Sequence, residues 1–228
     1  MKKIIIPFFC AVLFSAPAAA QKKSAAPAKT EAAKSQLTPK DVLNKYFDAL
    51  GGKSKLEAVK SIIIENTMNT QGMDISMTTT KSGNKFKSVQ SVMGQTITQV
   101  FDGEKGYMDQ MGQKIDLPAD QIPALKKGTP VDALAFEEAD FKSASAEKLD
   151  GKDYNVLVSD KGKSYFEAST GLLYKVGSDE GGMVVKNYMT VDGMKFPSEV
   201  EFEGKGQKAT IKTTKITVNP AIPDTEFK

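Results

Sequence analysis

Apolar side chains recur at helical intervals in residues 37–52, which read LTPKDVLNKYFDALGG. Thr38 is a favourable N-cap, Pro39 suits the first helical position, and the two final glycines favour a left-handed stop. The pattern predicts a well-capped amphipathic helix whose apolar stripe must pack on another element. The stripe consists of Val42, Leu43, Tyr46, Phe47 and Leu50.

The pattern changes after residue 60, where apolar positions alternate with polar ones as in half-buried strands. A short helix opened by Ser54 and Glu57, which have the spacing of a capping box, is predicted just before this change. Glycine-rich turns separate about ten or eleven predicted strands. We therefore predict an α+β, mainly β fold, with a large curved antiparallel sheet or unclosed β-barrel covered by a few helices.

Residues 117–141 are the one long interruption of the strand pattern. Two short helical stretches are predicted there, at residues 119–126 and 131–141, and prolines punctuate them. Two interpretations are equally open. The insert is either a lid that moves, or a set of short helices that completes the core.

The N-terminus has the features of a secretory signal peptide. A lysine pair precedes an apolar stretch, residues 4–14, which is too short to span a bilayer, and an A-x-A site ends at Ala20. We predict a signal peptide at residues 1–20, a disordered leader at 21–36 and a single domain at 37–228. The predicted location is the periplasm, reached through the Sec pathway, with the periphery of the outer membrane as an alternative site.

Several residue types are absent, and their absence narrows the chemistry. The sequence has no His, no Trp and no Arg, and its only Cys, Cys10, lies in the predicted signal peptide. The usual zinc ligands, the imidazole base, the thiolate nucleophile and the bidentate clamp for carboxylate or phosphate are therefore missing. We predict a protein that is not an enzyme and has no metal or cofactor, since no spacing indicates a Ser-Lys or carboxylate pair either.

Charge excludes a further class of partner. The net charge of the full sequence is only +3, so the basic field of a nucleic-acid binder is missing. Three acidic turns, at residues 150–153, 159–162 and 178–182, do not match a calcium-binding loop and are predicted to be hairpin turns. No segment after the N-terminus is long and apolar enough to be a transmembrane span.

Methionine is the most unusual feature of the composition, with ten in the sequence. Methionine is flexible and polarisable, so a surface built from it adapts to ligands such as acyl chains, although any single methionine equally suits a gap in a core. We predict an apolar cavity with the first helix as its lid and strands as its wall. The candidate ligand-binding residues are Tyr46, Phe47, Leu50, Ile62, Ile64, Met68, Met73, Ile75, Met77, Ile97 and Phe101.

Five segments carry a resemblance to a known family: DVLNKYFDALGGKSKLEAVKSI, VFDGEKGYMDQMGQ, STGLLYKV, VDGMKFPSEVEF and TVNPAIPDTEFK. Together they resemble the outer-membrane lipoprotein-sorting proteins of the LolA/LolB type, in a Bacteroidetes-type branch. Similar modules are attached to insulinase-type zinc peptidases. The resemblance spans residues 37–228 and implies an unclosed β-barrel with a helical lid, whose apolar cavity shelters lipoprotein acyl chains or other lipids in the periplasm.

One departure from that family bears on the ligand. The lipoprotein carriers use an arginine near the cavity mouth, and this chain has none to take that role. The resemblance therefore implies lipid binding more directly than lipoprotein transfer. Our leading hypothesis is a monomeric, non-enzymatic carrier that holds a lipid or lipoprotein acyl chain between sheet and helices. The alternative is an accessory module that docks on an envelope protein and holds no lipid.

Overall fold

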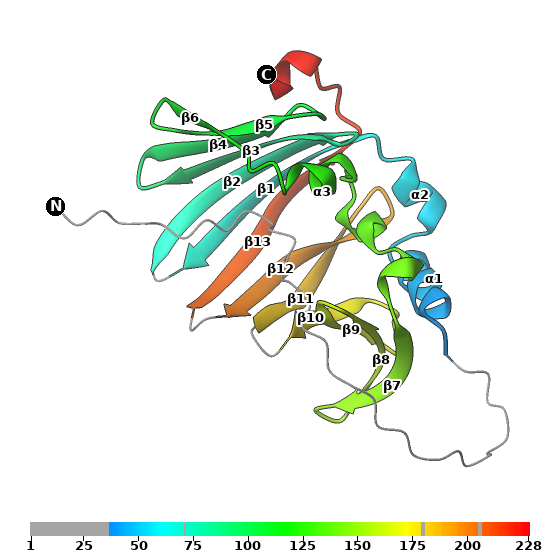
Figure 1. The fold of residues 1–228 in the computed structure, drawn as a ribbon. Helices are drawn as coiled ribbons and strands as arrows, with labels where there is room; N and C mark the ends of the chain where they lie inside the picture. Colours follow the sequence, from blue (N-terminus) through cyan, green and yellow to red (C-terminus); the bar gives the residue numbers. More distant parts are fainter. Residues whose placement is uncertain (1–36, 71, 179–180, 205–206) are drawn as a thin grey trace, which may run out of the picture. The chain divides into compact units, whose positions relative to one another are not determined.

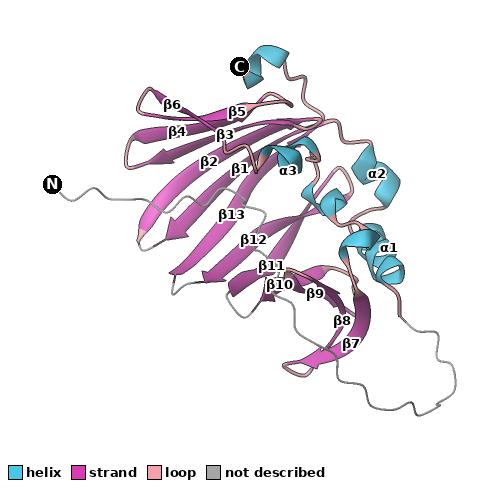
Figure 2. Cartoon of the chain, viewed as in Figure 1, coloured by secondary structure: helices cyan, strands magenta, loops and turns pink. Residues whose placement is uncertain are grey.

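A computed structural model describes residues 37–70, 72–178, 181–204 and 207–228. The predicted signal peptide and leader, residues 1–20 and 21–36, lie outside the described residues. Leu37–Lys228 forms one compact unit, in which a strongly curved sheet carries short helices (Figures 1 and 2).

Within the described residues, thirteen strands form the sheet. The first seven are β1 (Ser61–Thr70), β2 (Met73–Ser82), β3 (Lys85–Val92), β4 (Gln95–Phe101), β5 (Gly106–Gln110), β6 (Gln113–Asp116) and β7 (Ser143–Leu149). The others are β8 (Lys152–Ser159), β9 (Gly162–Glu167), β10 (Leu173–Ser178), β11 (Gly181–Val191), β12 (Met194–Gly204) and β13 (Gln207–Val218).

All neighbouring strands are antiparallel, in the order β6-β5-β4-β3-β2-β1-β13-β12-β11-β10-β9-β8-β7. The first and last strands pair at the centre, and β6 and β7 are the two edges, so within the described residues the sheet is not closed. This confirms the predicted fold class. The strand number exceeds the predicted ten or eleven, in part because the chain turns at Met111 and Gly112 and forms the short β5–β6 hairpin.

The first helix, α1 (Pro39–Ala49), begins as predicted. The Thr38 hydroxyl accepts a hydrogen bond from the Asp41 N–H (3.2 Å), and the Asp41 carboxylate accepts one from the Thr38 N–H (3.1 Å). Hydrogen bonds from the Thr38 hydroxyl and N–H hold the pKa of Asp41 below its usual value. This reciprocal capping box pins the start of α1.

The second helix, α2 (Lys53–Glu57), differs from its prediction. Its N-cap is Gly52, with no side-chain capping bond, so the capping box expected from Ser54 and Glu57 is wrong. Gly52 has a φ of 101°, and this backbone turn after α1 places the N-cap of the new helix two residues before the expected Ser54.

The insert between the edge strands is less helical than predicted. It contains α3 (Ile122–Lys126) and two 3-10 turns, η1 (Asp132–Ala135) and η2 (Glu138–Asp140). Phe136, which follows η1, is extended, with φ −79° and ψ 107°, so the stretch 131–141 cannot continue as one helix.

The core lies between α1, α2, the insert and one face of the sheet. We call this face the inner face and define it by Ile62 and Ile64 of β1, which pack in the core. Ile216 and Val218 of β13 lie opposite them on the same face. The opposite face is the outer face. Because side chains alternate along a strand, the register of each pair assigns every strand position to one face.

The C-terminal segment packs on the outer face and ends in η3 (Asp224–Phe227) beside β3. Phe227 is only 1% exposed. Ion pairs of 2.9 Å join Lys85 to Asp224 and Lys87 to Glu226. The segment is therefore anchored by one buried ring and flanked by pairs on the surface.

Phe227→Ala is expected to lower the free energy of unfolding by about 3 kcal/mol, because it empties a closed apolar site. Lys85→Ala removes only a partly exposed ion pair and should cost less than about 1 kcal/mol. Urea denaturation measures both values. Equal losses in the two variants would show that Phe227 does not anchor the segment.

Candidate functional site

The inner face carries apolar side chains beyond the part that α1 covers. Ladder register places Val200, Ile211, Met68, Ile75 and Val92 in one row across β12, β13, β1, β2 and β3. Phe202, Met73, Met77 and Ile97 flank this row on the same face. We call these nine residues the apolar strip.

The strip is partly accessible. Met68, Ile75, Val92 and Ile97 are 3 to 8% exposed. Phe202, Ile211, Met73 and Met77 are half-buried. The strip continues from the core, because Val200 packs against the core residues.

The eleven predicted ligand-binding residues divide into two groups. Tyr46, Phe47, Leu50, Ile62 and Ile64 come together in the core under α1. The other six lie outside that cluster on the inner face of β1, β2 and β4, namely Met68, Met73, Ile75, Met77, Ile97 and Phe101. The ring centroid of Phe101 lies 6.0 Å from that of Phe86, its cross-strand partner.

The apolar stripe of α1 is packed against aromatic rings. The ring centroid of Tyr46 lies 5.1 Å from that of Phe166 on β9 and 5.9 Å from that of Phe136 in the insert. Burial first, and then the negative charge of Asp132, raise the pKa of Tyr46 well above its usual value. Tyr46 therefore stays neutral in a dry environment at the centre of the core.

The insert takes part in the same core. Val131 is 4% exposed and belongs to the core cluster, and the partly buried Phe136 packs against that cluster. Lys81, whose side chain is only 18% exposed, forms an ion pair with Asp132 of the insert. These contacts favour the interpretation that the insert completes the core over the one in which it is a lid.

Polar side chains lie between the core and the apolar strip. Thr79, Ser88 and Gln99 form an inner-face row across β2, β3 and β4, and Ser88 and Gln99 are each 8% exposed. The side-chain oxygen of Asn66 on β1, whose cross-strand partner is Met77 on β2, is buried and has no hydrogen-bond partner among the described residues. Asn66 follows a bulge in the β1–β13 ladder. An amide oxygen only accepts hydrogen bonds, so a partner for this atom would have to be a donor group.

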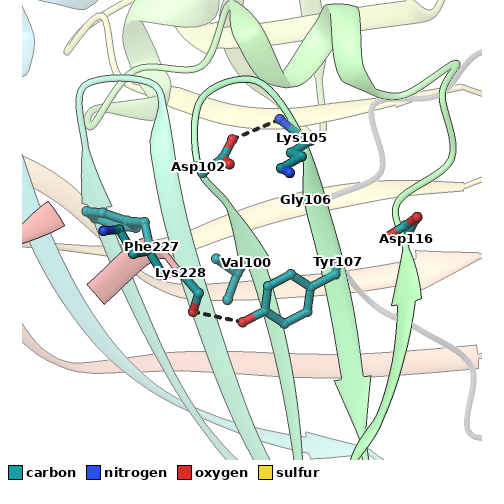
Figure 3. A pocket seen from close by; sticks show the side chains of 8 residues that line it. All are labelled: Val100, Asp102, Lys105, Gly106, Tyr107, Asp116, Phe227 and Lys228. Atoms are coloured by element: carbon teal, nitrogen blue, oxygen red, sulfur yellow. Dashed lines mark hydrogen bonds between the residues drawn. The ribbon is translucent and has the colours of Figure 1, made fainter. Parts of the chain in front are cut away.

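Two surface hollows lie away from the predicted residues. One, of about 350 Å³, lies between α2 and the insert and includes Val59 and Leu134. The other, of about 340 Å³, lies beside the C-terminal segment (Figure 3). Its polar groups bind one another: the Tyr107 hydroxyl donates to the Lys228 carbonyl (2.9 Å), and Asp102 accepts from the Lys105 N–H (2.9 Å). Neither hollow touches any of the eleven predicted residues.

Sequence reasoning missed Asn66, Val92, Phe202 and Ile211, which the structure adds to this region. Their strands were predicted, but the pairing of β1 with β13 joins residues about 145 positions apart, as in Met68 and Ile211. The available signal was the alternation in each strand, which gives the two faces without showing which strand is the neighbour.

Among the described residues, no cluster of three or more His, Cys, Asp or Glu side chains is arranged to hold a metal ion. None of the helices in the described ranges combines the length and the apolar character that crossing a bilayer requires.

The architecture defines the class of fold, which is that of the LolA superfamily. A LolA superfamily protein from Nitrosomonas europaea matches with a TM-score of 0.51 and 14% identity, over 84% of this chain and 98% of that chain. A protein domain from Vibrio parahaemolyticus assigned to outer-membrane lipoprotein sorting matches with a TM-score of 0.56 and 11% identity, over 83% and 97%.

A DUF1329 family protein from Desulfovibrio piger has the same arrangement, with a TM-score of 0.55 and 10% identity over 84% of this chain and 98% of that chain. No family model matches the sequence, and no curated protein matches it. The predicted LolA-like resemblance is thus confirmed as a fold, while the Bacteroidetes-type branch stays a prediction. At such low identities a shared fold does not identify the ligand, which must be inferred from this chain's own residues.

Proposed function

We propose that this protein is a non-enzymatic carrier or binding protein for the acyl chain of a lipid or lipoprotein. The observation that carries the proposal is the apolar strip, which extends the inner face beyond the core and leaves Met73 and Met77 half-buried. The LolA-like fold supports it, since two of the matched structures belong to that superfamily or to lipoprotein-sorting proteins.

The site proposed here differs from the cavity predicted under α1. Tyr46, Phe47 and Leu50 are core residues at most 5% exposed, so the acyl chain would lie along the strip, with Asn66 near its polar end. Binding is a partition, worth roughly 0.8 kcal/mol for each buried methylene group. Release then requires a membrane or partner that offers the chain an equally apolar environment.

The proposed location is the periplasm or the inner surface of the outer membrane. The support is the signal-like segment at residues 1–20, together with the lipoprotein-sorting role for which the matched Vibrio parahaemolyticus domain is named. The absence of arginine favours a lipid over a lipoprotein as the ligand. A test is to purify the protein from its native envelope and identify co-purified lipids by mass spectrometry.

Met77→Lys is expected to weaken binding of a fluorescent fatty acid at least about tenfold, because it places a charge within the apolar strip. Thr78→Lys is the matched control. Thr78 is the next residue on the same strand, is exposed, and faces outward, so the same charge there should leave the affinity unchanged. Fluorescence titration measures both, and thermal unfolding verifies that both variants fold.

Two results would contradict the proposal. One is equal affinity in Met77→Lys, Thr78→Lys and the unmodified protein. The other is a protein that carries no lipid from the envelope and binds no fatty acid. That second outcome, combined with recovery of a stable protein complex, would favour the accessory docking module.

A further inference from the structure

Two hairpin turns of this protein carry methionine where the backbone favours asparagine or aspartate. Among the described two-residue turns, Met93, Met111, Asp150 and Asp192 each have a φ between 49° and 57° and precede a glycine whose φ is also positive. These are type I′ turns, in which Asn or Asp at the first position is preferred because a short polar side chain tolerates the left-handed conformation. Methionine lacks that advantage. The backbone at Met93 and Met111 is therefore more strained than the backbone at Asp150 and Asp192.

The same two methionines are the most exposed large apolar side chains in the described part of the chain. Met93 is 84% exposed and Met111 is 73% exposed, followed by Ile115 at 56%. Single exposed apolar residues are ordinary, but these three lie on two adjacent hairpins, β3–β4 and β5–β6, which pair through β4 and β5. A strained backbone that displays an apolar side chain to solvent points to a use for that side chain.

The turns that carry Met93 and Met111, called the tips below, lie away from the core. The turns of the β3–β4 and β5–β6 hairpins lie at the strand ends away from α1 and α2 (Figure 1). By contrast, the Asp192 turn lies at the helical end, where the Lys195 N–H donates to the Leu50 carbonyl (2.9 Å). Methionine therefore occupies the two turns that project freely, and aspartate occupies one that packs beside α1.

The tips present no single sign of charge. Both read Met-Gly-Gln, at residues 93–95 and 111–113. The nearest charges have partners in their own hairpin: Asp109 accepts from the Gly112 N–H (3.0 Å), and the Lys114 ammonium lies 4.0 Å from the centre of the Tyr107 ring. An ionic partner is not favoured by this arrangement, whereas a neutral apolar one is.

A lipid bilayer fits these features better than a protein does. A stable protein interface needs roughly 800 Å² on each partner and is enriched in aromatic side chains and Arg, which the tips lack. Two flexible, unbranched side chains on projecting turns suit the boundary between headgroups and acyl chains, which lies within about 5–10 Å of the bilayer surface. Met108 and Ile115 on the inner face continue from the tips toward the apolar strip.

We propose that the β3–β4 and β5–β6 hairpin tips are a membrane-contact site, in which Met93 and Met111 insert into the surface of a zwitterionic bilayer. The contact goes beyond ligand binding and does not depend on it. It places the open inner face of β5 and β6 next to the bilayer, where a lipid enters or leaves by a short path. Because the tips carry no net charge of one sign, the contact is insensitive to salt.

The test uses protein purified from the cell envelope and phosphatidylcholine–phosphatidylethanolamine vesicles, in a flotation assay at low and high salt. The double variant Met93→Asn/Met111→Asn is expected to bind vesicles about tenfold more weakly, since two apolar side chains no longer leave water. Asparagine suits both turns, so the melting temperature of this variant should rise. Lost binding therefore cannot be attributed to a damaged fold.

The matched control is Asp150→Asn/Asp192→Asn, which creates the same asparagine-glycine turns elsewhere in the sheet. This control should bind vesicles as the unmodified protein does. Fatty-acid binding should be equal in all three proteins, which separates this proposal from the proposed function. Unchanged vesicle binding in the methionine variant, or no vesicle binding by the unmodified protein, would overturn the proposal. So would sedimentation of the unmodified protein as a dimer that the methionine variant abolishes, since a second copy would then cover the tips.

Discussion

Phe47→Ala is expected to lower the free energy of unfolding by about 3–5 kcal/mol, and the melting temperature by about 10 °C, because it leaves a cavity in a closed core. Phe47 is 5% exposed, and its ring centroid lies 5.9 Å from that of Tyr46. Chemical denaturation gives the free energy, and calorimetry gives the melting temperature.

Asn44→Ala on the exposed side of α1 is the control for that measurement. It changes the same helix without opening a cavity, so its effect should stay within about 0.5 kcal/mol. If Phe47→Ala instead leaves stability intact and weakens only fatty-acid retention, α1 acts as a lid, and the assignment of Phe47 to the core is wrong.

Gly51→Ala is expected to be comparably destabilising, by about 3–5 kcal/mol, because strain and a steric clash act together. Gly51 has a φ of 116°, and an added Cβ would lie 2.5 Å from the Gly193 carbonyl oxygen. Both groups belong to the backbone, so neither can move without shifting α1 away from the β11–β12 turn. Urea denaturation measures the loss.

Gly52→Ala separates the two causes. Gly52 has a similar φ of 101°, but an added Cβ meets nothing within 4 Å. The strain alone should cost about 1–3 kcal/mol. If the two alanine variants lose equal stability, the close approach of Gly51 to Gly193 does not contribute, and α1 is less firmly seated on the sheet than the structure indicates.

The sequence alone was sufficient to predict α1 and the positions of most strands. Thr38, Pro39 and the glycines after Leu50 act within a few residues of the helix ends, so their effect is independent of distant parts of the chain. The same locality explains the errors. Ser54 and Glu57 have capping spacing, but the turn at Gly52 had already started α2.

The candidate site was predictable only in part. All eleven chosen residues lie in the core or on the inner face, because alternation identifies the apolar side of each strand. Alternation does not show what covers that side. α1 residues and Val131 share one core cluster with Ile62, and Phe136 packs against it, whereas in the described part of the chain Met73 and Met77 do not belong to this cluster. An apolar residue belongs to the core where helices or the insert cover it, and it is available to a ligand where they do not.

What the sequence determined by itself was local: the start and end of α1, the alternating faces of the strands, and the turns between them. What the tertiary structure decided was long-range: the pairing of β1 with β13, the seating of α1 on Phe166, and the coverage of only part of the inner face. The physical reason is that hydrogen bonding and capping act over a few residues. Strand pairing and core coverage instead depend on contacts between segments more than 100 residues apart, as between Met68 and Ile211.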